Sequence, residues 1–300
     1  VVGRPPQEDT SFGELIHELT GDALSKEIPG LKEIHAVDAA GVHPLLLAIG
    51  SERYTPYIEV KQPSELLTIA NHILGTGQLS IAKFLFITAD DTNQLSTKNV
   101  GEFFLYILKR IDFKSDVHFY TNTSIDTLDY SGTSLNKGSK VVFAAYGNER
   151  RFLKREIPGC ILKLSNIKSA QLVMPGIVCI GMVPFQSYAG AELEMSLLNE
   201  QLKNYLGDLE ETPLIVVCDD AHFCGASLKN FLWVSFTRCN PSHDIYGVDS
   251  FTAHKHWGCR GPLIIDARIK PHHAPVLNTD KTVEKRIERL FEKGASLYGI

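Results

Sequence analysis

Residues 83–91 read KFLFITADD, and residues 212–220 read TPLIVVCDD. Each stretch is a short run of mainly apolar residues that ends in two aspartates. A run that is apolar at successive positions is typical of a β-strand buried on both faces of a sheet. The two copies stand 129 residues apart, so they indicate an internal repeat.

Three further pairs of segments support the repeat, and they follow one another in the same order in both copies. The paired segments are 26–30 and 155–159 (KEIPG, REIPG), 103–116 and 231–244 (FFLYILKRIDFKSD, FLWVSFTRCNPSHD), and 138–144 and 261–267 (GSKVVFA, GPLIIDA). The spacing stays near 128 residues for most pairs. The sequence therefore predicts a duplicated unit of about 120 to 130 residues, a normal domain size.

Strands and helices alternate around each copy. In the first unit we expect strands over 43–50, 83–88 and 141–145, with helices over 65–75 (capped by Ser64) and 100–111. In the second we expect strands over 176–183 and 214–218, with helices over 191–206 and 228–238. This alternation predicts an α/β fold of two duplicated strand-helix units with mostly parallel sheets.

The repeat divides the chain into four segments. We expect a motif segment with a first helix over 1–25, a first α/β unit over 26–150, a second over 151–275, and a C-terminal helix over 276–300. In the last segment Val283, Ile287 and Leu290 form one stripe opposite charged residues. Such a stripe predicts an amphipathic helix that is buried against another surface, here a neighbouring subunit, so a homo-oligomer is expected.

Composition argues against several classes of protein. Among 300 residues, 30 are basic and 35 acidic, which disfavours a nucleic-acid binder and a polybasic membrane anchor. The longest mainly apolar stretch, 172–185, is too short to span a bilayer, so no transmembrane segment is expected. No signal peptide is visible, and the six cysteines lack a CxxC spacing. Reduced thiols in the cytoplasm are therefore the prediction.

Two groups of residues could carry chemistry. The pairs Asp90-Asp91 and Asp219-Asp220 each follow a strand, where ligands bind in open α/β sheets, although turns and caps are the favoured interpretation. The second unit is also rich in zinc-ligand types, in a spacing that matches no familiar site: His222, Cys224, His254, His256, Cys259, His272 and His273. Scattered histidines are the favoured interpretation there. Glycine-rich phosphate loops and a GxSxG elbow are absent from the sequence.

The opening segment, residues 1–9, reads VVGRPPQED. Alone it would be read as a stiff proline segment followed by acids at a helix start. It resembles the signature of UbiD-type decarboxylases, the 3-polyprenyl-4-hydroxybenzoate carboxy-lyase family. The likeness continues, in order, over roughly the first 145 residues through 41–49, 83–91, 109–110, Asp116, 124–129 and 138–140. The second unit repeats part of the signature, which departs from the shorter family members.

The resemblance implies non-oxidative decarboxylation of an aromatic or α,β-unsaturated acid, such as 3-polyprenyl-4-hydroxybenzoate in quinone biosynthesis. It also implies prenylated FMN with a divalent metal (Mn or Mg) and potassium, held by an N-terminal domain that precedes the motif. We therefore expect a piece of a longer protein, without cofactor or metal ligands of its own and inactive alone. Glu8 is carried over as the proton donor, and Asp9 is a weaker candidate.

One departure from the family pattern separates the units. The family has an aspartate two apolar residues after GSK, where the first unit has Phe143 and the second keeps Asp266. The alternative function is an α/β oligomerisation module without catalysis, and a metal hydrolase using the second unit is a third hypothesis. A flavin-binding domain encoded ahead of Val1 would favour the decarboxylase.

Overall fold

The computed structural model describes residues 26–54, 57, 59, 61–273 and 280–299. Its internal contacts place residues 26–273 in one compact unit and residues 280–299 in another. The expected motif segment and first helix over 1–25 lie outside the described residues.

The first repeat forms a five-stranded sheet in the order β1-β2-β3-β5-β4. Its strands are β1 (Leu31–Ala36), β2 (Leu45–Gly50), β3 (Phe84–Ala89), β4 (Val117–Thr123) and β5 (Gly138–Ala145). Its helices are η1 (Asp38–Ala40), α2 (Ser64–Gly75), η2 (Gly77–Ile81) and α3 (Val100–Arg110).

The second repeat forms a sheet in the order β6-β7-β8-β12-β9. Its strands are β6 (Ser169–Met174), β7 (Ile177–Gly181), β8 (Leu214–Cys218), β9 (Ile245–Gly247) and β12 (Leu263–Asp266), and a hairpin of β10 (Ser250–Ala253) and β11 (His256–Cys259) is inserted. Its helices are α4 (Gly159–Leu162), α5 (Tyr188–Leu202), η3 (Lys203–Tyr205), α6 (Leu206–Leu209), α7 (Ala221–Gly225), α8 (Leu228–Thr237) and α9 (Pro241–Asp244).

The two sheets have the same strand order and the same strand directions, which confirms the predicted common topology. The three central strands of each sheet are parallel, as predicted, whereas both edge strands are antiparallel. The sheets are thus evenly mixed rather than mostly parallel. Only eight residues join β1 to β2, and a parallel neighbour would need a crossover of a dozen or more.

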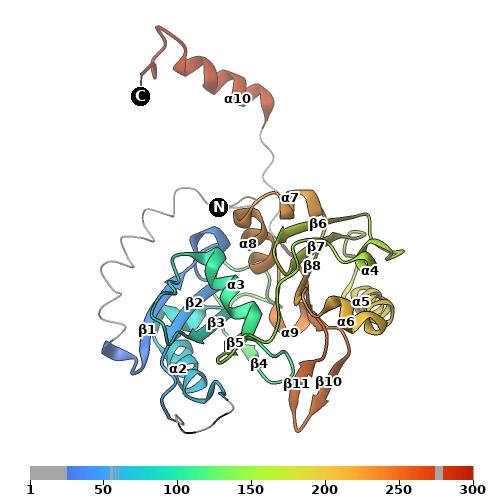
Figure 1. Ribbon diagram of the computed structural model, residues 1–300. Coiled ribbons are helices and arrows are strands. Elements are labelled where there is room, and N and C mark those ends of the chain that lie inside the picture. Colours follow the sequence, from blue (N-terminus) through green and yellow to red (C-terminus); the bar gives the residue numbers. More distant parts are fainter. Residues whose placement is uncertain (1–25, 55–56, 58, 60, 274–279, 300) are drawn as a thin grey trace. The chain divides into compact units, whose positions relative to one another are not determined.

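A shared apolar core joins the repeats. Alternate side chains of the strands enter it, such as Phe84 and Phe86, together with residues of α3 and α8. These two helices lie between the two sheets (Figure 1). Phe236 of α8 packs edge-to-face on Phe84 with ring centroids 4.9 Å apart. The intervening strand residues face separate outer cores, under α2 in the first repeat and α5 in the second.

All ten residues predicted for the core are buried. They are Leu46, Phe84, Phe86, Phe104, Ile107, Val178, Ile215, Val217, Phe231 and Val234.

The start of α2 differs from the prediction. Ser64 is the first helical residue and makes no capping hydrogen bond. Instead the Glu52 carboxylate accepts hydrogen bonds from the backbone N–H groups of Glu65 (2.9 Å) and Leu66 (3.2 Å). A carboxylate from an earlier loop satisfies these groups as well as a local cap would.

The C-terminal unit contains α10 (Lys281–Glu288) and the 3-10 turn η4 (Arg289–Phe291), close to the predicted helix. Asp280 caps α10 by accepting from the Thr282 N–H at 2.8 Å. The side chains of Val283, Ile287 and Leu290 are 45%, 50% and 42% exposed. No helix within the described residues has the length and apolar character needed to cross a membrane.

Candidate functional site

A buried ion pair lies where the repeats meet. The Lys83 ammonium, at the start of β3, is fully buried and lies 2.8 Å from the Asp129 carboxylate. It also donates to the Ser131 hydroxyl (2.6 Å) and, across the repeat boundary, to the Cys239 carbonyl (2.9 Å). Its charge is thus compensated, and Lys83 ties a loop of the first repeat to the end of α8.

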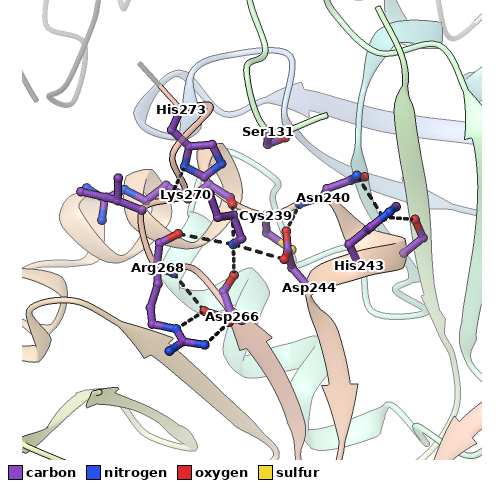
Figure 2. Close-up of polar contacts among 12 residues, drawn as sticks. Ser131, Cys239, Asn240, His243, Asp244, Asp266, Arg268, Lys270 and His273 are labelled. Carbon is purple, nitrogen blue, oxygen red and sulfur yellow. Dashed lines mark hydrogen bonds and ion pairs between the residues drawn. The ribbon is translucent and has the colours of Figure 1, made fainter. Parts of the chain in front are cut away.

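A second buried charge cluster follows β12 (Figure 2). The Arg268 guanidinium binds Asp266 through two hydrogen bonds of 2.9 and 2.7 Å and also pairs with Glu194 at 2.5 Å. The Lys270 ammonium lies 3.2 Å from Asp244 and donates to the Asp266 carbonyl at 2.8 Å. Every charge in this cluster therefore has an opposite partner, and both cations are buried.

Burial dominates the electrostatics of this cluster. It raises the pKa of Asp244 to about 6, although Lys270 and the Asn240 N–H oppose the shift. It lowers the pKa of His273 to about 2, and the Lys270 charge adds to the effect. His273 is neutral at pH 7, and its Nε2 is buried without a hydrogen-bond partner in the described part of the chain.

One feature of the cluster occurs in both repeats. Asp116 accepts a hydrogen bond from the Asp112 N–H at 2.8 Å, and Asp244 accepts one from the Asn240 N–H at 2.7 Å. Both aspartates close the turn that follows the helix, α3 or α8. These motif positions therefore stabilise a local turn rather than face a ligand.

The first strand-end aspartate pair is structural, as the favoured interpretation held. The Asp90 carboxylate accepts from the N–H groups of Thr92 (2.9 Å), Gln94 (2.7 Å) and Leu95 (2.7 Å). Burial opposes the charge, but these bonds outweigh it and lower the pKa of Asp90 to about 2. Asp91 forms an ion pair with Lys61 at 2.7 Å.

The second pair is structural too. Asp219 accepts from the Ile269 N–H at 2.8 Å and lies 3.5 Å from the Arg238 guanidinium. Asp220 caps α7 by accepting from the Phe223 N–H at 3.0 Å. Each aspartate thus fixes a loop or a helix start.

The histidines and cysteines of the second repeat do not converge on a metal site. Within the ranges that the structure describes, no group of three or more His, Cys, Asp or Glu side chains is arranged to hold a metal ion. His222 and His254 are exposed, whereas His272 and His273 pack ring against ring at 4.8 Å. All six cysteines are free and buried.

A cleft of about 570 Å³ lies between α6 and the loops around residues 112–114, 150–151 and 260–262. Its cations are engaged: Arg150 pairs with Asp112 at 2.7 Å, and Arg260 with Asp249 at 3.0 Å. Arg151 donates to two carbonyls at the end of α3. Lys114 lies 3.6 Å from the same Asp112 carboxylate. This cleft therefore offers no unpaired cation for a flavin phosphate, so its lining does not fit prenylated FMN.

Phe143 and Asp266 occupy equivalent strand positions in the two repeats, and the structure shows why these residues differ. Phe143 stacks on Phe86 with ring centroids 4.5 Å apart, so the first repeat uses this strand position for packing. The second repeat uses it for the buried ion pair with Arg268. The buried pairs of Lys83, Arg268 and Lys270 were not predicted, although a charge beside an apolar strand was a visible signal of such a pair.

The predicted catalytic residues, Glu8 and Asp9, lie outside the described residues. Their roles stay predictions.

Comparison with known proteins identifies the first repeat. Residues 10–145 match the family model of the 3-octaprenyl-4-hydroxybenzoate carboxy-lyase C-terminal domain. Residues 10–145 therefore carry a UbiD-type C-terminal domain. This confirms the resemblance inferred from the sequence.

Relatives align along nearly all of this chain. A protein of Chlamydia pneumoniae named as a 4-hydroxybenzoate decarboxylase subunit is 33% identical over 289 residues, 96% of this chain and 45% of that protein. A Chlamydia muridarum protein is 32% identical over 295 residues, 98% of this chain and 46% of that protein. The chain thus spans about half the length of these relatives, and the alignment includes the second repeat.

Solved structures are more distantly similar. The UbiD-class enzyme HmfF from Pelotomaculum thermopropionicum, in complex with FMN, matches 49% of this chain and 31% of its own, at 16% identity and a TM-score of 0.34. A likeness of this size transfers no feature of the site.

Proposed function

We propose that the chain is the C-terminal portion of a UbiD-like carboxy-lyase that decarboxylates an aromatic or unsaturated acid with prenylated FMN. The observation that carries the proposal is the alignment of 96% of the chain with a relative named as a 4-hydroxybenzoate decarboxylase subunit. The motif at residues 1–9 supports it independently. A 4-hydroxybenzoate, with or without a prenyl chain, is the substrate class that we propose.

In this proposal Glu8 supplies the proton. Loss of CO2 leaves an electron pair on carbon that must be protonated, and a carboxylic acid is a suitable general acid. When bound, prenylated FMN with its metal and potassium would supply the electron sink. We place that cofactor on a part of the full protein other than residues 26–273, as the family resemblance implies.

The second candidate is the oligomerisation module. It is favoured by the way these charged groups of residues 26–273 are used. Lys83, Arg268 and Lys270 form buried ion pairs, and the strand-end aspartates serve ion pairs, loops or caps. Both candidates assign a scaffold role to the two repeats. They differ in whether the full protein releases CO2 through Glu8.

The deciding experiment uses the full-length protein loaded with prenylated FMN. Glu8→Gln should retain flavin absorbance but lose decarboxylation by about 10²- to 10⁴-fold, because glutamine cannot donate the proton. Asp9→Asn tests the weaker candidate and should keep most of the activity if Glu8 is the donor. Wild-type decarboxylation by Glu8→Gln would show that Glu8 is only a helix cap.

We also propose that the apolar stripe of α10, Val283, Ile287 and Leu290, packs against a second copy of the chain. Three half-exposed aliphatic side chains on one face are seldom left in water. Sedimentation should show a smaller assembly for protein ending at Asp280 than for the intact chain. An unchanged mass would refute this oligomer contact.

A further inference from the structure

Three cysteines of the second repeat gather at the carboxyl end of its sheet. Cys179 lies in β7, Cys218 ends β8, and Cys224 lies in α7. All three side chains are at most 1% exposed. The Cys179 and Cys224 sulfurs are 2.9 Å apart, which is closer than two non-bonded sulfurs normally pack.

We propose that Cys179 and Cys224 form a reversible disulfide that fastens α7 to β7. A disulfide has an S–S length of about 2.0 Å, so the sulfurs need to approach by only about 0.9 Å. The two cysteines belong to different elements, so the bond would constrain the fold and not merely a local turn. It would close a loop that contains α5 and β8.

The surroundings of α7 give an oxidant a route to the pair. This helix is only five residues long, and its His222 and Phe223 side chains are exposed. Local opening of so short an element costs less than global unfolding and would expose Cys224. Its position also depends on few bonds, among them the Asp220 cap and the Asn230 side chain, which donates to the Phe223 carbonyl.

Cys218 is the third thiol of this group. Hydrogen bonds from the Cys179 and Cys224 thiols lower its pKa, although burial opposes the shift. A thiolate is the attacking form in thiol–disulfide exchange. Cys218 is thus the competing partner, and the test must separate it from Cys224.

The reaction we propose is exchange with a low-molecular-weight disulfide. Burial and the neighbouring Cys218 raise the pKa of the Cys179 and Cys224 thiols, so the attacking thiolate forms once α7 opens and Cys224 meets water. Cys224 then attacks oxidised glutathione and releases one glutathione thiol, and Cys179 displaces the other glutathione. Two protein thiols are oxidised to one disulfide, and one glutathione disulfide is reduced to two thiols. In a reducing compartment the pair stays as thiols, so the bond marks oxidising conditions.

The experiment treats the folded protein with oxidised glutathione, blocks the remaining thiols and maps the disulfides without reduction. Cleavage on the amino side of Asp219 separates Cys218 from Cys224, and cleavage at Asp208 separates both from Cys179. We expect a linked Cys179–Cys224 peptide, a mass loss of two hydrogens, and a raised melting temperature that dithiothreitol reverses.

Cys160→Ser is the matched control, because Cys160 is buried in α4, away from the trio, and the link should form normally. Cys179→Ser and Cys224→Ser should each abolish it, and the wild-type map stands even if either variant folds poorly. The proposal is wrong if the link involves Cys218, if only glutathione adducts appear, or if oxidation requires denaturant. None of these outcomes depends on decarboxylase activity.

Discussion

At the scale of single residues, His273 makes stability depend on pH. Its folded-state pKa is lowered from 6.5 to about 2 by burial and by Lys270, so below pH 6.5 the unfolded chain binds a proton that the folded chain does not. Stability must therefore fall as the pH falls below 6.5. Between pH 7.5 and 5.5, wild type should lose about 1 kcal/mol more unfolding free energy than His273→Gln.

Urea denaturation followed by tryptophan fluorescence at the two pH values measures this difference. His222→Gln removes an exposed histidine and is the matched control, which should keep the wild-type loss. An equal loss for His273→Gln and wild type would mean that His273 becomes protonated in the folded protein.

Single residues also show which features the sequence could predict and which it could not. Core positions such as Phe84 and Val217 followed from apolar runs, because a buried strand needs such residues at every position. Lys83 and Arg268 did not, because a buried charge is stable only with partners that lie far away in the sequence. Arg268 and Glu194 are far apart in the sequence, so the residues next to either one do not indicate that the two form a pair.

At the scale of elements, the β10–β11 hairpin is held against the first repeat by a close backbone contact. A Cβ on Gly258 would lie 2.9 Å from the Phe113 carbonyl oxygen and 2.8 Å from that of Lys114. The neighbouring Cys259 N–H donates to the same Phe113 carbonyl at 3.1 Å. Gly258→Ala must push the hairpin outward, and we expect a loss of about 1–3 kcal/mol in unfolding free energy.

Gly207→Ala is the matched substitution, since nothing lies within 4 Å of its Cβ position in α6. It should leave stability unchanged or raise it by up to about 1 kcal/mol through helix propensity. Equal stability of Gly258→Ala and wild type in chemical denaturation would show that the hairpin does not depend on this contact.

The same hairpin was absent from the sequence prediction for a physical reason. Its turn places His254 and Lys255 at positive φ, 51° and 66°, where glycine or asparagine is the usual signal. The edge strand β4 was missed because its sequence, VHFYTNT, is largely polar and half-exposed. Long apolar elements such as β3 and α3 were predicted within one or two residues of their bounds.

At the scale of the whole molecule, the repeat predicted a common topology, because two similar sequences adopt similar folds. The repeat could not predict that α3 and α8 would share one core. The sequence of one repeat does not specify which surface of the other repeat it packs against. The arrangement of residues 1–9 could not be derived either, so the catalytic residues proposed there rest on the sequence motif alone. The buried ties across the boundary, such as Lys83 to the Cys239 carbonyl, emerge only from the three-dimensional packing.

That shared core implies that residues 26–273 unfold as one cooperative unit. Phe236, in the second repeat, has ring centroids within 6.0 Å of those of Phe84, Phe86 and Phe104 in the first. Phe236→Ala should lower the unfolding free energy by about 3–5 kcal/mol. Each loss of about 1.4 kcal/mol makes amide hydrogen exchange that requires global unfolding about tenfold faster. Exchange should therefore accelerate by the same factor in β3 and β8, whereas Phe152→Ala, at a side chain 77% exposed, should change neither. Acceleration confined to β8 would show that the repeats open independently, despite the core they share.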